Sequence, residues 1–398
     1  MDSQQEKRNK KKRRLLIAII IIFIVLIAAI AIAVVLKVRS VKNEIEREII
    51  ESGDFDRNGY HDGDEEALQA LIDRQRELGA SVQSIYDEDQ YRWEDGRLVE
   101  IHWSSVRLKG DISFAGLDEL EYIFCDDNKL TSIDIGQNPR LRGLVCGGGN
   151  IDSLDVSQNT ELEFLYCSEN NLSELDVSKN VYLSDLYCDY NKIEVLNIKN
   201  CEQLFTLECS NNNLAELDVS DGSGLRILNC SNNNITNLNL DICVNLLTFN
   251  CSYNPISELD ISHNLLLREL DVSGLGLTQL DVTKHGYLEV LNCAELNLQQ
   301  LDLTYNEKLK ELHCEYNALT TLDIRQNLHL EVLICHDNML EELDVSNNAA
   351  MVLLNCDGNQ LETIDFTGCD SGCYVVCDAG VEVFGLDAAC ITYIEPEE

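Results

Sequence analysis

Apolar residues recur along most of this 398-residue chain with a period of 21 residues. The repeating pattern is L-x-x-L-x-C-x-x-N-x-L-x-x-L-D-V-S-x-N-x-x, which is clearest over residues 162–180. Within it, Leu165 and Cys167 are two residues apart, the spacing at which side chains of a strand point to the same face. No single repeat can bury its apolar positions, whereas stacked repeats share one continuous core. The pattern therefore predicts a solenoid of short parallel strands.

Cysteine occupies one strand position in twelve of thirteen consecutive repeats, and Val272 occupies it in the other. These column cysteines are Cys125, Cys146, Cys167, Cys188, Cys209, Cys230, Cys251, Cys293, Cys314, Cys335, Cys356 and Cys377. Neighbours in one column of a parallel sheet lie about 4.8 Å apart and point the same way, whereas the Cβ atoms of a disulfide lie about 3.8 Å apart. We therefore predict that the column cysteines are buried free thiols that pack as small apolar side chains.

The leucine spacing and the cysteine position identify leucine-rich repeats, with a parallel sheet on the concave side. The array is expected over residues 98–368, with Trp103 in the cysteine position of an atypical first repeat. Residues 369–398 are expected to form the last repeat and a C-terminal cap. In that cap, a bond from Cys373 to Cys369 or Cys390 is left open.

The polar residues that recur within the repeats have structural explanations. Asparagines three residues after the column position are expected to bind buried backbone groups of adjacent turns. Asparagines or cysteines thirteen residues after it are also expected to be structural. An Asp or Asn nine residues after it forms a row that could bind cations, but a local turn hydrogen bond with the following Ser or Thr fits better.

A segment of 22 residues without a polar side chain runs from Leu15 to Leu36, long enough to cross a bilayer as a helix. Seven Lys and Arg residues precede it, and by the positive-inside rule they hold residues 1–14 in the cytoplasm. We therefore predict a single-pass anchor at 15–36, with the C-terminal ectodomain outside the cell. A cleaved signal peptide is the alternative, although the apolar segment is long for one.

The chain carries 70 Asp and Glu residues against 30 Lys and Arg residues, a formal net charge of −40. Seven of the basic residues lie in the N-terminal tail, so the part after the membrane segment is more acidic still. Such a surface repels the phosphates of nucleic acids, and no basic stripe offsets that repulsion. A nucleic-acid partner is therefore not expected, whereas calcium becomes a reasonable ligand.

One segment before the repeats matches the EF-hand calcium loop D-x-[DN]-x-[DN]-G-x5-E. Its expected oxygen ligands are Asp54, Asp56, Asn58, the carbonyl of Tyr60, Asp62 through water, and Glu65. Apolar residues within 45–50 and 68–72 give the flanking helices a buried side. We therefore predict a small helical, EF-hand-like cap within residues 37–97 that holds one weak calcium site. An acidic, solvated loop is the alternative.

The strand register also predicts a binding surface on the concave side of the sheet. Residues three before, one before and one after each column position point away from the core. Near the N-terminal end of the array, these positions contain Tyr122, Phe124, Val145, Phe164, Tyr166 and Tyr187. Tyr190, just beyond its strand, is added to the predicted surface. Contiguous apolar patches tend to be interaction sites, and Tyr is enriched among binding hot spots. Chance exposure of residues that favour strands is the alternative.

The cysteine column and the phrase C-S-x-N-x-L-x-x-L-D-V-S-x-N resemble internalin-type bacterial surface proteins, most closely the internalin J type with its cysteine ladder. The resemblance covers roughly residues 44–390. It implies an EF-hand-like helical cap before the repeats, and cell-surface recognition, often adhesion, through the sheet side.

These features favour a membrane-anchored cell-surface protein that binds a protein or glycan through its concave face. An enzyme is not expected, because the chain has no H-E-x-x-H or G-x-S-x-G segment and its column cysteines point inward. A structural surface spacer and a surface hydrolase are the alternatives. A spacer would show no exposed apolar cluster.

Overall fold

The computed structural model describes residues 60–367 and 372–394. The predicted membrane segment 15–36 and most of the predicted calcium loop, including Asp54, Asp56 and Asn58, lie outside these residues. Within the described ranges, no helix is both long and apolar enough to cross a bilayer. The membrane anchor therefore remains a prediction.

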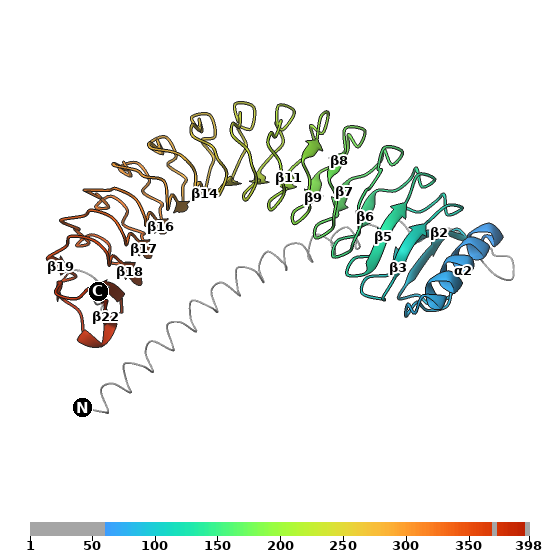
Figure 1. Cartoon of the computed structure of the whole chain (residues 1–398), viewed down its shortest axis with the longest axis horizontal. Coiled ribbons are helices and arrows are strands. Elements are labelled where there is room, and N and C mark those ends of the chain that lie inside the picture. The colour runs from blue at the N-terminus through green and yellow to red at the C-terminus, as the bar shows by residue number, and fades with distance from the viewer. Residues whose placement is uncertain (1–59, 368–371, 395–398) are drawn as a thin grey trace.

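The described chain is an arc of stacked turns with one long sheet along its inner side (Figure 1). Sixteen strands form this sheet, and only the pair β1–β2 is antiparallel. The strands are β1 (Tyr91–Glu94), β2 (Arg97–His102), β4 (Tyr122–Phe124), β6 (Gly143–Val145), β7 (Phe164–Tyr166), β9 (Asp185–Tyr187), β11 (Thr206–Glu208), β12 (Ile227–Asn229), β13 (Thr248–Asn250), β14 (Glu269–Asp271), β15 (Val290–Asn292), β16 (Glu311–His313), β17 (Val332–Ile334), β18 (Leu353–Asn355), β20 (Tyr374–Asp378) and β22 (Ile391–Ile394). The predicted leucine-rich-repeat solenoid with a parallel sheet is confirmed.

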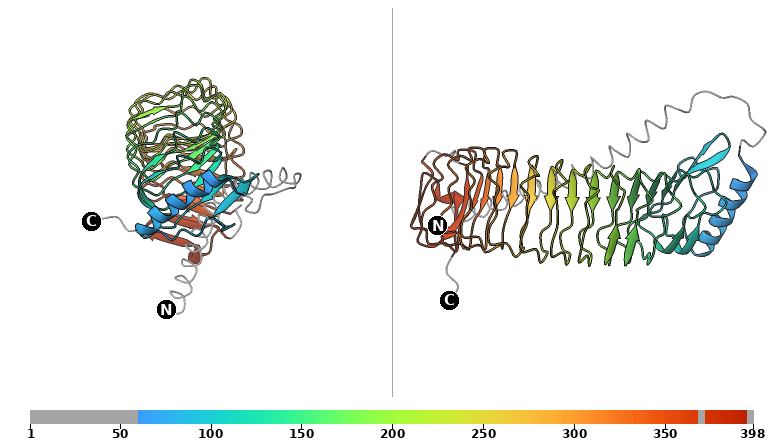
Figure 2. Two further views of the ribbon diagram at one scale, coloured as in Figure 1. Left: turned by 90° about the vertical axis from the view of Figure 1, so that its right-hand side faces the viewer. Right: turned by 90° about the horizontal axis from the view of Figure 1, so that it is seen from above.

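The remaining elements are short and lie at the ends or elsewhere in the turns. Helix α2 (Asp62–Glu77) covers the N-terminal end of the stack (Figures 1 and 2). Three two-stranded sheets pair β3 with β5, β8 with β10, and β19 with β21. The strands of these pairs are β3 (Lys109–Ser113), β5 (Lys129–Asp134), β8 (Glu174–Asp176), β10 (Val195–Asn197), β19 (Thr363–Asp365) and β21 (Glu382–Phe384). A short 3-10 helix, η1 (Ala388–Cys390), precedes β22.

The column cysteines form the predicted ladder of free thiols. All twelve are at most 2% exposed and unbonded, and Val272 is fully buried in the same column. Burial raises the pKa of the Cys230 thiol to about 12, so the thiol stays protonated and is a poor nucleophile. In the C-terminal cap Cys373 and Cys390 are buried, but Cys369 lies outside the described residues, so their pairing stays open.

We expect Cys230→Val to leave stability nearly unchanged, because Val272 fills the same position two repeats later. Cys230→Ser should lower the free energy of unfolding by about 1–3 kcal/mol, since it places a hydroxyl in an apolar column. Chemical denaturation of the two variants and the parent protein measures the difference. A Ser variant as stable as the Val variant would contradict the apolar role of the column.

The asparagines three residues after the column position join consecutive turns, as predicted. In the repeat of Cys230, the Nδ2 of Asn233 donates to the carbonyls of Cys209 and Cys230, both at 3.0 Å. Its Oδ1 accepts from the backbone N–H of Leu214 at 2.9 Å. The same arrangement recurs at Asn128, Asn170, Asn191, Asn212, Asn254, Asn317, Asn338 and Asn359.

The acid or amide nine residues after the column position makes a turn hydrogen bond in every one of its twelve described repeats. Its Oδ1 accepts from the backbone N–H two residues later. Hydrogen bonding lowers the pKa of several of these carboxyls, among them Asp155 and Asp218, and at Asp323 the hydrogen bond from Arg325 lowers it to about 2. The structural interpretation of this row is therefore confirmed.

A second buried column lies thirteen residues after the first and contains asparagine in most repeats. Asn306, which is fully buried, donates from Nδ2 to the carbonyls of Val282 and His285 at 3.0 Å. His285 itself occupies this column, with 1% exposure and its Nε2 3.1 Å from the carbonyl of Ile261. The sequence pattern did not single out His285, whose place in the register makes it a structural residue.

The N-terminal cap is only partly helical, which corrects the expectation of a helical cap up to residue 97. Leu68 and Ile72 of α2 are fully buried, as their spacing predicted. After the helix, however, β1 and β2 form an antiparallel hairpin. Asp95 and Gly96 make its turn with φ angles of 48° and 77°. An Asp-Gly pair between strand-like segments is a hairpin signal that the sequence analysis did not use.

Asp64 fixes α2 to the first repeat. Its carboxylate is 1% exposed and accepts from Arg97 Nε at 2.8 Å and Arg97 Nη2 at 3.0 Å. It also accepts from the backbone N–H of Leu98 at 2.9 Å. Arg97 extends the network to Asp118 and Glu119. A charge in the first turn of α2 is thus paired with the strand beneath it.

Candidate binding surface

Four of the predicted surface residues form one connected aromatic cluster on the concave sheet. The ring centroids of Tyr122 and Phe164 lie 6.0 Å apart, those of Phe164 and Tyr166 lie 5.3 Å apart, and those of Tyr166 and Tyr187 lie 4.7 Å apart. Tyr166 and Tyr187 are direct cross-strand partners on β7 and β9. The strand register therefore brings together rings from three repeats, here termed the aromatic cluster: Tyr122, Phe164, Tyr166 and Tyr187.

Gly143 makes the contact between Tyr122 and Phe164 possible. It lies between them on β6, and a Cβ at this position would fall 2.1 Å from the ring of Phe164. The ring of Phe164 therefore lies over the glycine and reaches the ring of Tyr122 on the next strand. A glycine at an outward strand position is the sequence signal for such a contact.

The predicted surface residues differ in how far solvent can reach them. Tyr190 is 58% exposed, whereas Phe124, Val145, Phe164, Tyr166 and Tyr187 are half-buried. Tyr122 is only 2% exposed, because Phe164 stacks on it. This corrects the expectation that all these side chains are open to a ligand, since Tyr122 supports the surface from beneath. Burial raises the pKa of Tyr187 to about 12, so its hydroxyl is neutral.

His102 extends the aromatic surface toward the N-terminal cap. Its ring stacks on Phe124 with a centroid distance of 4.7 Å and an interplanar angle of 5°. His102 precedes Trp103, so it occupies the outward position of the first repeat that Phe124 occupies in the second. The sequence analysis placed Trp103 in the column but did not carry the outward register back to His102.

Carboxylates border the aromatic cluster on its C-terminal side. Glu208 on β11 is the direct cross-strand partner of Tyr187. Asp185, two residues before Tyr187, is 4% exposed. Burial raises the pKa of Glu208 to about 7, and the nearby charge of Asp189 contributes in the same direction. Aromatic rings and acidic groups therefore meet in one part of the sheet.

The rest of the concave face changes character along the arc. Amides occupy the outward positions of β12, β13 and β15 at Asn229, Asn250 and Asn292. Farther along, β17 and β18 carry half-buried aliphatic residues, among them Val332 and Ile334. The aromatic side chains are thus concentrated toward the N-terminal end, while an aliphatic area, which the sequence analysis did not describe, lies toward the other.

Neither a family model nor a curated protein matches this chain. Among solved structures, the functional domain of InlJ from Listeria monocytogenes, which includes a cysteine ladder, matches 70% of the chain with 32% identity and a TM-score of 0.67. The resemblance to internalin-type cysteine-ladder repeats is confirmed. The chain spans 63% of the length of that InlJ domain.

More distant structures agree with the fold of this internalin-like array. The match to an internalin, inlF, from Listeria monocytogenes includes 81% of this chain and 90% of the inlF chain, with 16% identity and a TM-score of 0.56. The match to a plant peptide hormone receptor, RGFR1, solved in complex with RGF2, includes 73% of this chain and 56% of the receptor chain, with 16% identity and a TM-score of 0.60. At such identities the likeness is one of fold alone.

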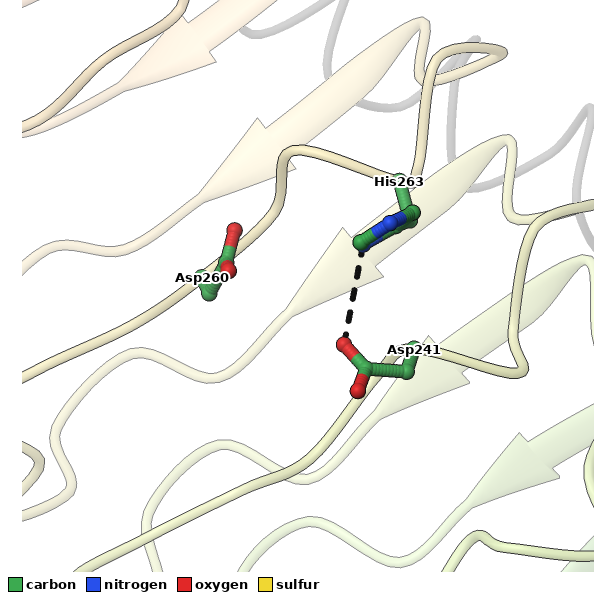
Figure 3. A group of neighbouring side chains, drawn as sticks. All are labelled: Asp241, Asp260 and His263. Atoms are coloured by element: carbon green, nitrogen blue, oxygen red, sulfur yellow. Dashed lines mark ion pairs between the residues drawn. The ribbon is translucent and has the colours of Figure 1, made fainter.

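Three exposed side chains on neighbouring turns of the internalin-like array could in principle hold a metal ion: Asp241, Asp260 and His263 (Figure 3). Asp241 and His263 form an ion pair, with 3.6 Å between Oδ1 and Nδ1. Asp260 accepts the turn hydrogen bond from the backbone N–H of Ser262 at 2.8 Å, as its counterparts do in other repeats. These contacts explain the group without an ion.

A hollow near the N-terminal end of the array lies apart from the predicted surface residues. It is lined by Arg107, Lys109, Asp127, Asn128, Lys129 and Gly148. One of its cations is already engaged, because Lys109 donates from Nζ to the carbonyl of Leu78 at 3.0 Å. None of its lining residues is one of the predicted surface residues.

Two of the predicted calcium ligands lie in the described part of the chain with their side chains. The ring of Tyr60 lies 4.6 Å from that of Trp93. Glu65, in the first turn of α2, accepts a hydrogen bond from the hydroxyl of Tyr86 at 3.1 Å on Oε1. Asp62 is the first residue of α2. Glu65 is the twelfth residue of the predicted loop, the position at which an EF-hand has its bidentate Glu.

Proposed function

We propose that this chain is a membrane-anchored cell-surface recognition protein that binds a protein or glycan through its concave face, in the manner of an adhesin. The observation that carries the proposal is the aromatic cluster. Its rings of Phe164, Tyr166 and Tyr187 are half-buried, mutually packed and held on a regular sheet, so they offer preorganised apolar area at little entropic cost. A structural spacer has no need of such a surface.

The proposed topology is single-pass, with the N-terminus in the cytoplasm and the ectodomain outside the cell. It is supported by the apolar segment 15–36 and by the seven cations that precede it. An external location also agrees with the resemblance of the repeats to those of internalin-type bacterial surface proteins. The membrane itself is thus one partner, and the ligand of the concave face is the other.

The proposal is non-catalytic. The column thiols are held protonated by burial, as the raised pKa of Cys146, about 12, illustrates. His285 is a buried structural residue, and His102 stacks on Phe124. These residues have structural explanations, so they do not supply a nucleophile or general base.

We expect the double change Phe164→Ser and Tyr166→Ser to weaken binding by at least about 2 kcal/mol, because it removes the centre of the aromatic cluster. The matched control is Val332→Ser with Ile334→Ser, at the equivalent outward positions of β17. The measurement is binding of the full chain, reconstituted in nanodiscs, to cell-surface protein fractions and to a glycan array.

The melting temperature of the double variant should fall modestly, because Phe164 also covers Tyr122 and Gly143. Full binding by this variant, together with lost binding by the β17 control, would move the site to the aliphatic end of the arc. Full binding by both would refute recognition through the concave face.

We also propose that residues 54–65 bind one calcium ion weakly, with Asp54, Asp56, Asn58, Tyr60, Asp62 and Glu65 as ligands. We expect millimolar calcium to raise the melting temperature of the full chain, because a ligand of the folded state stabilises it. Glu65→Gln should abolish this rise, since the bidentate carboxylate is lost. An intact chain whose melting curve does not respond to chelator would leave the segment an acidic loop.

A further inference from the structure

We propose that the concave face recognises a lysine or arginine side chain of a protein partner, with Tyr187 and Glu208 as the contact residues. This rests on the proposed function and specifies its ligand chemistry. The site, here termed the cation site, lies where the aromatic cluster meets the carboxylates that border it.

The strand register places the parts of the cation site side by side. Tyr166, Tyr187 and Glu208 occupy the same outward position on the adjacent strands β7, β9 and β11. Asp185 lies on the parallel outward row, opposite Thr206. A ring face attracts a cation electrostatically, and a neighbouring carboxylate adds a charge-assisted hydrogen bond. An aromatic ring beside a carboxylate therefore suits an ammonium or guanidinium group.

Glu208 differs from Glu163 and Glu289, two acids that directly precede strands of the inner sheet, because those two have basic partners within the chain. Glu163 pairs with Arg142 at 2.6 Å, and Glu289 pairs with Lys310 at 2.6 Å. Within the described residues, no ion pair joins Glu208 to a basic side chain, and the charged group that most affects it is another acid, Asp189. A cation from a partner would supply the missing charge.

The electrostatics of the free protein support the same conclusion. Burial raises the pKa of Glu208 to about 7, with a smaller contribution from the charge of Asp189, and the opposing hydrogen bond with Asn229 does not offset this rise. The pKa of Tyr187 is also raised, mainly by burial and in addition by the charges of Glu208 and Asp185. A bound cation would stabilise the carboxylates, and it would come from a partner less acidic than this chain, whose net charge is −40.

The test uses the full chain in nanodiscs, applied to an array of random dodecapeptides. Each of the strongest peptides is then resynthesised with its lysines acetylated and its arginines replaced by citrulline. Glu208→Gln is compared with Glu216→Gln, which removes the same charge from an exposed position in the same repeat, off the concave strand. Tyr187→Leu is compared with Tyr187→Phe, which keeps the ring face.

We expect Lys or Arg in the strongest peptides and at least a tenfold loss of affinity with Glu208→Gln and with Tyr187→Leu, but not with their controls. Acetylated or citrulline peptides should bind at least tenfold more weakly. Equal losses with Glu208→Gln and Glu216→Gln would overturn the cation site, because net charge alone would then explain binding.

Other outcomes separate the cation site from the proposed function. Strong peptides without a cation, whose binding still requires Phe164 and Tyr166, would overturn the cation site and leave recognition by the concave face intact. Binding to a glycan array but to no peptide would overturn it as well. Binding that no concave-face variant alters would overturn both. Circular dichroism melting of each variant confirms that a loss does not reflect unfolding.

Discussion

Asn233→Ala should lower the free energy of unfolding by about 3 kcal/mol, although it deletes only an amide group. The change leaves the N–H of Leu214 without its partner and removes one of two amide donors from the carbonyls of Cys209 and Cys230, which keep Asn212 and Asn254. An unsatisfied buried backbone group costs about 1–3 kcal/mol. Because these bonds join two turns, the loss weakens the interface between repeats rather than one repeat alone.

The matched control is Asn234→Ala, which removes the same group from an exposed position one residue later and should cost little. Chemical denaturation measures both, and hydrogen exchange locates the effect. We expect amides on both sides of the Cys209–Cys230 interface to exchange faster in the Asn233 variant. If the two alanine variants were equally stable, the buried amides would not be what holds neighbouring turns together.

Much of the fold was predictable because one register repeats along the chain. Once Cys167 is known to point inward, the same assignment follows for every position 21 residues away, and stacking is the way to bury them. The polar rows were predictable for the same reason. The Asp or Asn that precedes a turn in every repeat, such as Asp281, accepts a hydrogen bond from the equivalent backbone N–H each time.

The departures from the prediction arise where side chains of different strands meet. Register alone places Tyr122 outward, but Phe164 covers it because Gly143 leaves room between them. A pattern of single positions does not contain this three-strand contact. The sequence analysis likewise did not connect the neighbouring acids with the aromatic cluster, whereas the cross-strand pairing shows that Glu208 adjoins Tyr187.

The N-terminal cap was the least predictable part, because it follows no repeat. Asp64 lies within the calcium-loop motif at a position that the motif leaves unspecified. The structure shows that it instead pairs with Arg97, 33 residues away, and with the backbone of Leu98. A contact across such a sequence distance has no local signal.

We expect Asp64→Ala to destabilise the cap by about 3 kcal/mol. The carboxylate is 1% exposed, and breaking a buried ion pair by removing one partner is strongly destabilising. Arg97 retains Asp118 and Glu119 as partners, so the cost falls mainly on the backbone N–H of Leu98 and on the first turn of α2. Hydrogen exchange of the α2 amides measures this local loss.

Asp73→Ala is the matched control, since Asp73 is exposed on the same helix and hydrogen-bonds only a neighbouring side chain, that of Gln69, four residues earlier. It should leave exchange in α2 nearly unchanged, because alanine is the better helix former. Unchanged exchange in the Asp64 variant would show that burial of Leu68 and Ile72 alone holds the helix. Faster exchange confined to α2 would show that the Asp64–Arg97 pair attaches the cap. In a solenoid each turn contacts only its neighbours, so lost stability at one end affects the rest of the array only through the adjacent turn.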